Sequence, residues 1–198
     1  MFDVLKVLIS AVAGYLLGSI NTSLVVGKFY GTDVRKHGSG NAGATNTLRT
    51  LGKTAALFVL IGDILKGILA CLIGLMVFGR TGEIIAGSLA IIGHNWPLYF
   101  GFRGGKGVLT SFSVLLVIDY KIALLVLLAF IIVTLATRYV SLSSISAAVA
   151  LPILAIILKR DLGLIVFYAL LGLLVIIRHR SNNERLLKGT EPKIGKKA

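Results

Sequence analysis

Long apolar stretches recur along this chain from residue 4 to residue 178, and the stretch 122–137 carries no charged residue at all. A membrane β-barrel would need segments of about ten residues with alternating hydrophobicity, and this pattern is absent. Because lipid offers the backbone no hydrogen-bonding partner, stretches of this kind cross a bilayer as helices. The sequence therefore predicts an all-α integral membrane protein.

The composition agrees with a membrane-embedded chain. Hydrophobic residues make up 56% of the 198 positions and charged residues only 15%, whereas about a quarter of the residues in a soluble domain are charged. The apolar character continues without a shift until roughly the last twenty residues. We therefore expect one membrane-embedded domain, a single helical bundle over residues 1–198.

Seven stretches are apolar enough to be membrane spans. They lie near residues 4–27, 55–78, 83–99, 107–119, 122–137, 141–158 and 162–178. The third and fourth are shorter than the roughly 20 residues that cross about 30 Å of hydrocarbon. Five full crossings with one broken or re-entrant pair is therefore an open alternative to seven.

The basic residues indicate the orientation of these spans. With seven spans, 14 of the 21 Lys and Arg residues fall in the loops and the tail on one side. Cytoplasmic loops carry an excess of Lys and Arg. We therefore expect the N-terminus outside, the C-terminus in the cytoplasm, and all three polar segments described below on the cytoplasmic face of a bacterial inner membrane.

Three classes of site or partner are not expected. The net charge of +13 does not indicate nucleic acid, because the basic residues lie in loops and the tail without interleaved aromatic residues, and anionic lipid headgroups are the expected partner. The single cysteine, Cys71, lies in an apolar run and is expected only to pack. The histidines and carboxylates show no metal-ligand spacing, so neither a metal nor a cofactor is expected.

The first polar segment runs from His37 to Arg49 and is rich in small, hydroxyl and amide residues. Small residues let backbone N–H groups converge on an anion, so this composition favours a phosphate-binding nest. The candidate site residues are Gly38, Ser39, Gly40, Asn41, Gly43, Ala44, Thr45 and Asn46. The planar guanidinium of Arg49 is suited to holding a phosphate through two hydrogen bonds. A plain glycine-rich turn between two helices is the alternative.

The second polar segment opens the fourth predicted span and consists of Gly104, Gly105, Lys106 and Gly107. Backbone donors and a lysine gather there at a helix N-terminus, where anions bind well. The segment is not a Walker A loop, because no strand precedes it and Gly107 stands where a hydroxyl residue is required. A basic topology signal is the alternative. His94, at the end of the third span, is interpreted equally as a structural hydrogen-bonding group or a catalyst.

The third polar segment begins at His179 and is expected to continue the last helix out of the membrane. His179 and Asn182 are three residues apart and so share a helical face, where they can contact one ligand. Anchoring to lipid headgroups is the alternative. Asp63 and Lys66, in the second span, are also three residues apart and can neutralise each other, either as a structural pair or as a support for the site.

At these positions the sequence resembles the acyl-phosphate-dependent glycerol-3-phosphate acyltransferases of bacterial phospholipid synthesis, the PlsY family. The resemblance runs nearly end to end. It is carried by His37 to Asn41, Gly43 to Asn46, Leu48-Arg49, Asp63 to Gly67, Gly93-His94, Gly104 to Val108, Thr137 to Ser141, Arg178-His179-Arg180 with Asn182, and Gly189-Thr190-Glu191.

The resemblance implies transfer of a fatty acyl group from acyl phosphate to the 1-hydroxyl of sn-glycerol 3-phosphate, giving lysophosphatidic acid and inorganic phosphate. It implies that Ser39, Arg49, Lys106, His179 and Asn182 are catalytic, and that the Gly104 to Gly107 loop binds glycerol phosphate. Glu191 is interpreted as structural. The expected partners are acyl phosphate, glycerol 3-phosphate and the bilayer, and the protein is expected to work as a monomer.

One function of another class stays open, a phosphate or organic-anion transporter with a site at the bilayer midplane. The sequence shows no internal repeat and its polar residues gather at one boundary, so the acyltransferase is favoured. The sequence also leaves open whether His179 or the substrate's own phosphate removes the hydroxyl proton. It favours the phosphate, because no carboxylate is obviously placed to orient His179.

Overall fold

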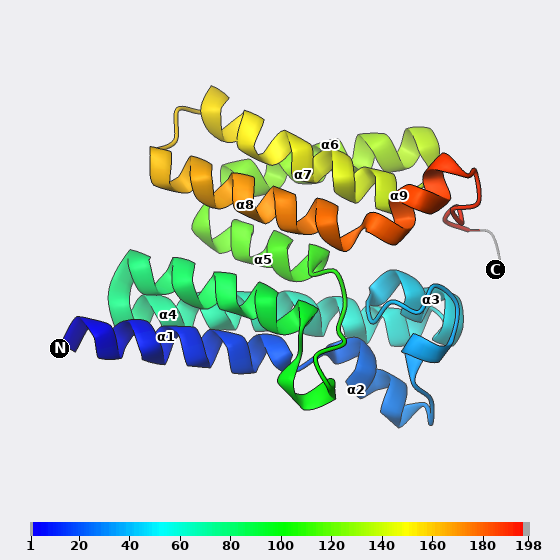
Figure 1. Cartoon of the computed structure of the whole chain (residues 1–198), viewed down its shortest axis with the longest axis horizontal. Helices are drawn as coiled ribbons and strands as arrows, with labels where there is room; N and C mark the ends of the chain where they lie inside the picture. The colour runs from blue at the N-terminus through cyan, green and yellow to red at the C-terminus, as the bar shows by residue number, and fades with distance from the viewer. Residues whose placement is uncertain (1, 196–198) are drawn as a thin grey trace. The chain divides into compact units, whose positions relative to one another are not determined.

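The computed structural model describes residues 2–195, which are helical apart from short loops and contain no β-strand (Figure 1). The α-helices are α1 (Phe2–Ser19), α2 (Thr22–Phe29), α3 (Ala44–Leu51), α4 (Lys53–Asn95), α5 (Val108–Ile118), α6 (Tyr120–Thr137), α7 (Val140–Ile157), α8 (Leu162–Arg178) and α9 (Arg180–Leu187), with 3-10 turns η1 (Val34–Lys36) and η2 (Leu98–Phe100). The chain forms two compact units, Met1–Ile118 and Asp119–Ala198.

In the first unit, α4 is a hairpin of two antiparallel arms. Phe78 (φ −145°) and Gly79 (φ 55°) leave the helical conformation, and glycine adopts a positive φ without steric cost. The arms then lie so close that a side chain on Gly74 would clash with the backbone of Gly82. The second and third predicted spans are therefore the two arms of α4, and Figure 1 shows the chain turning back between them.

Small residues bring α1 against the second arm of α4. A side chain on Gly14 would clash with the backbone of Ala86, and a side chain on Gly18 with that of Ala90. Residues four apart lie on one face of a helix, so each helix presents a strip of small residues to the other. Lipid supplies no hydrophobic driving force between helices, and such close backbone contact provides the van der Waals packing that holds them together.

The first predicted span is interrupted near its C-terminal end. α1 ends at Ser19 and α2 begins at Thr22, because the side chain of Asn21 caps α2 by accepting a hydrogen bond from the N–H of Leu24 at 3.1 Å. The interruption presents the carbonyl of Ile20 to a partner outside the helix. Lys66 Nζ of α4 donates to that carbonyl at 3.1 Å.

The second unit consists of α6 to α9, with α7 packed against both α6 and α8. Short loops join α6 to α7 and α7 to α8, so these consecutive helices run antiparallel. Asp119 caps α6 at the N–H of Ile122, and it accepts from Arg160 Nε at 2.6 Å and from Arg160 Nη2 at 2.9 Å. This bidentate pair ties the start of α6 to the loop between α7 and α8.

Among the described residues, four helical stretches are long and apolar enough to cross a membrane. They are Phe2–Phe29, Lys53–Phe100, which contains both arms of α4, Tyr120–Thr137 and Val140–Ile157; α8 joined to α9 gives a fifth, bent by 58°. α5 has 11 residues and is therefore about 16 Å long, roughly half the hydrocarbon thickness. The all-helical membrane architecture is confirmed, and the number of complete crossings stays a prediction.

The contact between α1 and α4 leads to a first prediction. Gly18→Leu should destabilise the protein, because a leucine has no room against the backbone of Ala90, and overpacking typically costs about 1–3 kcal/mol. The measurement is the apparent unfolding temperature in detergent. Val12→Leu, on the exposed face of α1, is the matched control and should unfold like the parent protein. A Gly18→Leu variant as stable as that control would contradict the close packing.

Candidate functional site

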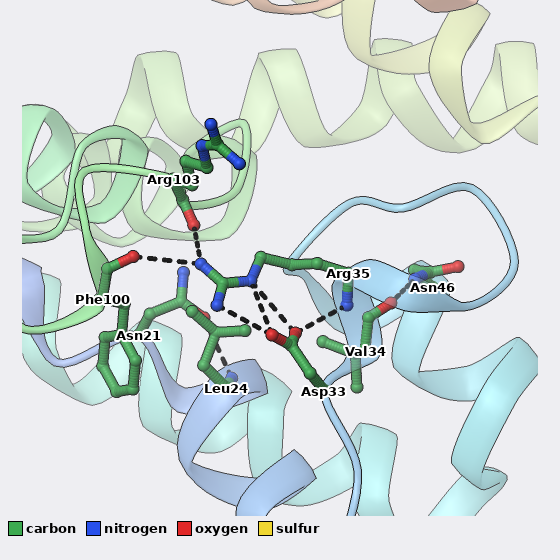
Figure 2. A network of polar contacts seen from close by, with 8 residues as sticks. All are labelled: Asn21, Leu24, Asp33, Val34, Arg35, Asn46, Phe100 and Arg103. Carbon is green, nitrogen blue, oxygen red and sulfur yellow. Dashed lines mark hydrogen bonds and ion pairs between the residues drawn. The ribbon is translucent and has the colours of Figure 1, made fainter.

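Arg35 joins the turn just before the first polar segment to the loop just before the second, within the first unit (Figure 2). Its Nε and Nη2 donate to the carboxylate of Asp33, and its Nη1 donates to the carbonyls of Phe100 and Arg103 at 3.0 Å each. The hydrogen bonds from Arg35 hold the pKa of the Asp33 carboxyl below its ordinary value. The pair stays charged at neutral pH and fastens the loop after α4 to η1.

Asn46 holds the first polar segment in shape from inside. Its side chain is 1% exposed, its Nδ2 donates to the carbonyls of Val34 at 2.9 Å and His37 at 3.0 Å, and its Oδ1 accepts from the backbone N–H of Ser39 at 2.8 Å. A side chain on Gly38, where φ is 57°, would clash with Asn46 Oδ1. Both amide hydrogens of Asn46 are therefore used to shape the loop around Ser39.

The other predicted site residues of this segment lie around Asn46. Gly40 also has a positive φ, 71°, and Gly43 is the N-cap residue of α3. Thr45 and Arg49 lie on α3, and both are half-buried, as is Ser39. The remaining predicted members, Asn41 and Ala44, are half-buried as well.

The second polar segment folds back onto the end of α4. The N–H of Gly104 donates to the carbonyl of Asn95 and the N–H of Gly105 to the carbonyl of His94, both at 3.2 Å. A side chain on Gly105 would clash with the ring of His94 and with the carbonyl oxygen of Ala42. The first and second polar segments therefore meet at Gly105, as a shared phosphate site requires.

Lys106 lies at this junction, half-buried between two buried glycines. Gly107 has a φ of 75°, which favours glycine, and α5 begins directly after it at Val108. The predicted placement of this loop at a helix N-terminus is thus confirmed. Gly105 and Gly107 both lack room for a side chain, the latter because of Asn95 Oδ1.

The third polar segment lies in the second unit and does not continue α8 as we expected. The helix ends at Arg178 and α9 begins at Arg180, with a bend of 58° between them. The apolar α8 suits lipid while the polar α9 does not, so the chain changes direction where its composition changes. The carbonyl of His179 accepts from the N–H of Asn182 at 2.8 Å, which keeps these two residues together across the bend.

The ring of His179 has a defined orientation and is 3% exposed. Its Nδ1 lies 2.7 Å from the carbonyl oxygen of Val175. Because a carbonyl only accepts, Nδ1 must carry the hydrogen, and in the neutral ring Nε2 is then the nitrogen with a lone pair. A backbone carbonyl thus orients this histidine, where the sequence offered no carboxylate for the task.

Glu191 organises this part of the molecule, which agrees with its interpretation as a structural residue, although the sequence did not indicate which residues it holds. Its Oε1 accepts from Ser141 Oγ at 2.7 Å and from Asn182 Nδ2 at 2.6 Å, and its Oε2 accepts from Arg185 Nε at 2.7 Å. Glu191 fixes the amide of Asn182 with Nδ2 toward the carboxylate. Nothing in the helical spacing links Glu191 to Asn182, because Gly189, with a φ of 68°, turns the chain between them.

The carboxylate of Glu191 leads to a second prediction. Burial raises its pKa, but the hydrogen bonds from Ser141, Asn182 and Arg185 outweigh burial, and the pKa lies below its ordinary value. Glu191 therefore stabilises the fold above about pH 4.3, its unfolded value, and this stabilisation is lost as the pH falls through the lower folded pKa.

Glu191→Gln should lower the apparent unfolding temperature at pH 7, and its curve should converge with that of the parent protein in acid. The measurement is thermal unfolding in detergent between neutral and acidic pH. Glu184→Gln, at an exposed position on α9, is the matched control and should follow the parent curve throughout. Parallel curves for Glu191→Gln and the parent protein would contradict the assignment.

Among the described residues, no group of three or more His, Cys, Asp or Glu side chains is arranged to hold a metal ion. The site that the structure does contain is built from glycine loops, amides, hydroxyls and cations. Such groups bind anions.

Comparison with known proteins gives a consistent result. A sequence model of the glycerol-3-phosphate acyltransferase family matches residues 8–189. A glycerol-3-phosphate acyltransferase of Clostridioides difficile (strain 630) is 48% identical over 98% of both chains. One from Thermoanaerobacter sp. (strain X514) is 44% identical over 96% of both chains.

Solved structures agree. The crystal structure of PlsY (YgiH), an integral membrane glycerol 3-phosphate acyltransferase, in its glycerol 3-phosphate form has a TM-score of 0.90 at 38% identity and covers 96% of both chains. Its lysophosphatidic acid form has a TM-score of 0.87 at 37% identity, covering 96% of this chain and 95% of the other. The chain belongs to the glycerol-3-phosphate acyltransferase family.

Proposed function

We propose that this protein transfers a fatty acyl group from acyl phosphate to the 1-hydroxyl of sn-glycerol 3-phosphate, as the first acylation step of phospholipid synthesis. The family match over residues 8–189 carries this proposal. The crystallised relative is described in forms with glycerol 3-phosphate and with lysophosphatidic acid, the acceptor and the product of this reaction. The relatives give no support to a transporter.

The reaction suits a site made of anion-binding groups. The hydroxyl oxygen of glycerol 3-phosphate attacks the acyl carbon, the bond from that carbon to the phosphate oxygen breaks, and phosphate leaves. The leaving group is a stable anion, so the protein needs positioning and charge stabilisation rather than a strong general acid. The loops that meet at Gly105 would hold phosphates, with Arg49 and Lys106 as cations and Ser39 as a hydroxyl donor.

His179 and Asn182 are proposed to act on the glycerol hydroxyl in the same reaction. With the hydrogen on Nδ1, Nε2 of His179 is suited to accept a hydrogen bond from a hydroxyl of glycerol 3-phosphate, which has two. We favour the substrate's own phosphate as the base, because its second pKa is near 6 and it belongs to the same molecule as the nucleophile. Asn182, whose amide Glu191 orients, would position the substrate.

The arrangement in the membrane is also part of the proposal. We propose seven spans, with the N-terminus outside, the C-terminus in the cytoplasm, and the polar segments facing the cytoplasm of a bacterial inner membrane. The 14 basic residues on that side support it. We propose further that the chain acts as one domain and as a monomer.

The identity of the donor is the third prediction. Purified protein with glycerol 3-phosphate should form lysophosphatidic acid rapidly from palmitoyl phosphate and at least a hundredfold more slowly from palmitoyl-CoA, because only the first donor offers an acyl phosphate group to the glycine loops. The assay is product formation with a radiolabelled acceptor. Lys106→Met should have reduced but measurable activity with palmitoyl phosphate. Comparable rates with both donors would refute the proposed donor.

The base is the subject of the fourth prediction. With saturating glycerol 3-phosphate, His179→Gln should retain reduced activity and keep the acidic limb of the pH profile of kcat near pH 6, the second pKa of a phosphate monoester. The measurement is kcat between pH 5 and pH 9, with Glu184→Gln as a control on α9. A profile that loses this limb and rises in proportion to hydroxide would make His179 the base.

Sidedness is the fifth prediction. Single cysteines at the exposed positions Lys36 and Arg103, in a Cys71→Ser background, should be shielded from an impermeant maleimide in intact cells. A cysteine at Lys159, exposed in the loop between α7 and α8, should be labelled and serves as the positive control. Labelling of the first two from outside would reverse the proposed orientation.

A further inference from the structure

Three ionisable side chains of the first unit are buried together where α4 and the interrupted first span meet. Asp63, Lys66 and His94 are 1%, 5% and 3% exposed, respectively. Lys66 Nζ lies 2.9 Å from Asp63 Oδ1 and 2.7 Å from His94 Nδ1. The reaction proposed above uses none of the three, and charged side chains buried in a membrane protein are paired with one another and usually have a function.

Lys66 connects three segments through one ammonium group. Lys66 Nζ donates to the carbonyl of Ile20 at 3.1 Å, lies 2.7 Å from His94 Nδ1, and forms an ion pair with Asp63 Oδ1 at 2.9 Å. Ile20 lies between α1 and α2, Asp63 on the first arm of α4, and His94 at the end of the second arm. The position of the His94 ring is therefore fixed relative to all of these segments.

The Nδ1 edge of the His94 ring faces the buried ion pair. Nδ1 lies 2.7 Å from Lys66 Nζ and 3.5 Å from Asp63 Oδ1. The Nε2 edge of the ring lies where a side chain on Gly105 would be, next to the carbonyl oxygen of Ala42. The backbone carbonyl of His94 also accepts from the N–H of Gly105 at 3.2 Å.

We propose that Asp63, Lys66 and His94 form a positioning network for the Gly104 to Gly107 loop, in which Lys66 holds the His94 ring so that its Nε2 edge supports Gly105 and hence Lys106. This inference rests on the proposed function in taking Lys106 as a phosphate-binding residue. His94 is a positioning residue, and the network binds neither substrate.

Two substitutions of His94 distinguish its two possible roles. One role is to support Gly105 through Nε2, and the other is only to pair with Lys66 through Nδ1. Glutamine carries a polar atom at the place of Nε2, whereas asparagine carries one at the place of Nδ1. If support of Gly105 matters, His94→Asn should raise a substrate KM at least tenfold while His94→Gln raises it less than threefold. If His94 only satisfies Lys66, the order is reversed. Either the reversed order or equal effects would overturn the proposal.

Comparing the KM values of the two substrates shows whether a substitution of His94 acts through the Gly104 to Gly107 loop. In Lys106→Met, the KM of one of the two substrates should increase more than that of the other. The same substrate should show the larger KM increase in His94→Asn, and the KM of the other substrate should change less than threefold in both variants. If Lys106→Met leaves both KM values unchanged, the proposed role of Lys106 fails. If Lys106→Met has its effect and His94→Asn does not, only the positioning network fails.

A matched control comes from α4 itself. Glu83 is 3% exposed and pairs with Arg80, three residues away, as Asp63 pairs with Lys66. Glu83, however, lies in the part of the second arm next to the hairpin turn. Glu83→Gln removes a buried carboxylate charge without touching the loop, and both KM values should stay within twofold of the parent protein. An increase in KM equal to that of His94→Asn would show a general effect of perturbing α4 and overturn the proposal.

Loop mobility gives a readout that does not depend on activity. A nitroxide label on Phe102→Cys, an exposed position just before Gly104, in the Cys71→Ser background should report a more mobile loop in His94→Asn than in His94→Gln or Glu83→Gln. Equal spectra in the three variants would count against the network.

Discussion

Every polar group at membrane depth must find its partner within the protein, because lipid supplies none. The interrupted first span shows the consequence: the carbonyl of Ile20 is bonded by Lys66, and Lys66 in turn needs Asp63. Asp119 and Arg160 form a second ion pair at the start of α6. The helix arrangement follows from such pairings and from glycine contacts, since hydrophobicity alone does not tell one lipid-facing helix from another.

The glycines of this chain serve two different purposes. Gly14, Gly18 and Gly74 lie in helices and remove side chains where backbones touch, so they set how close α1 and the arms of α4 approach. Gly38, Gly40 and Gly107 lie in loops with positive φ and permit the turns of the candidate site. Gly105 has no such φ, and it must be glycine because His94 and Ala42 occupy the space around it.

The sequence predicted the membrane class, the helical stretches and the three polar segments, because hydrophobic length and loop composition are local properties. It did not predict that Asn46 uses its amide inside the loop, that Arg35 joins two loops, or that Glu191 holds Asn182. These contacts link residues across turns whose geometry no periodicity describes. The bend at His179 was missed for a related reason, since the spacing of His179 and Asn182 fits both a continuous and a broken helix.

The two buried histidines show how a neighbour at Nδ1 decides what an imidazole can do. At His94, Nδ1 faces a buried ion pair, the Lys66 ammonium at 2.7 Å and the Asp63 carboxylate at 3.5 Å. At His179 the partner is a carbonyl, which only accepts, so the ring presents a lone pair at Nε2. His179 is therefore suited to receive a hydrogen bond from a hydroxyl at Nε2, while His94, whose Nε2 lies against Gly105, is suited to support that loop. The same residue type thus has different roles at two places in one chain, and the difference lies in the partners rather than in the motif.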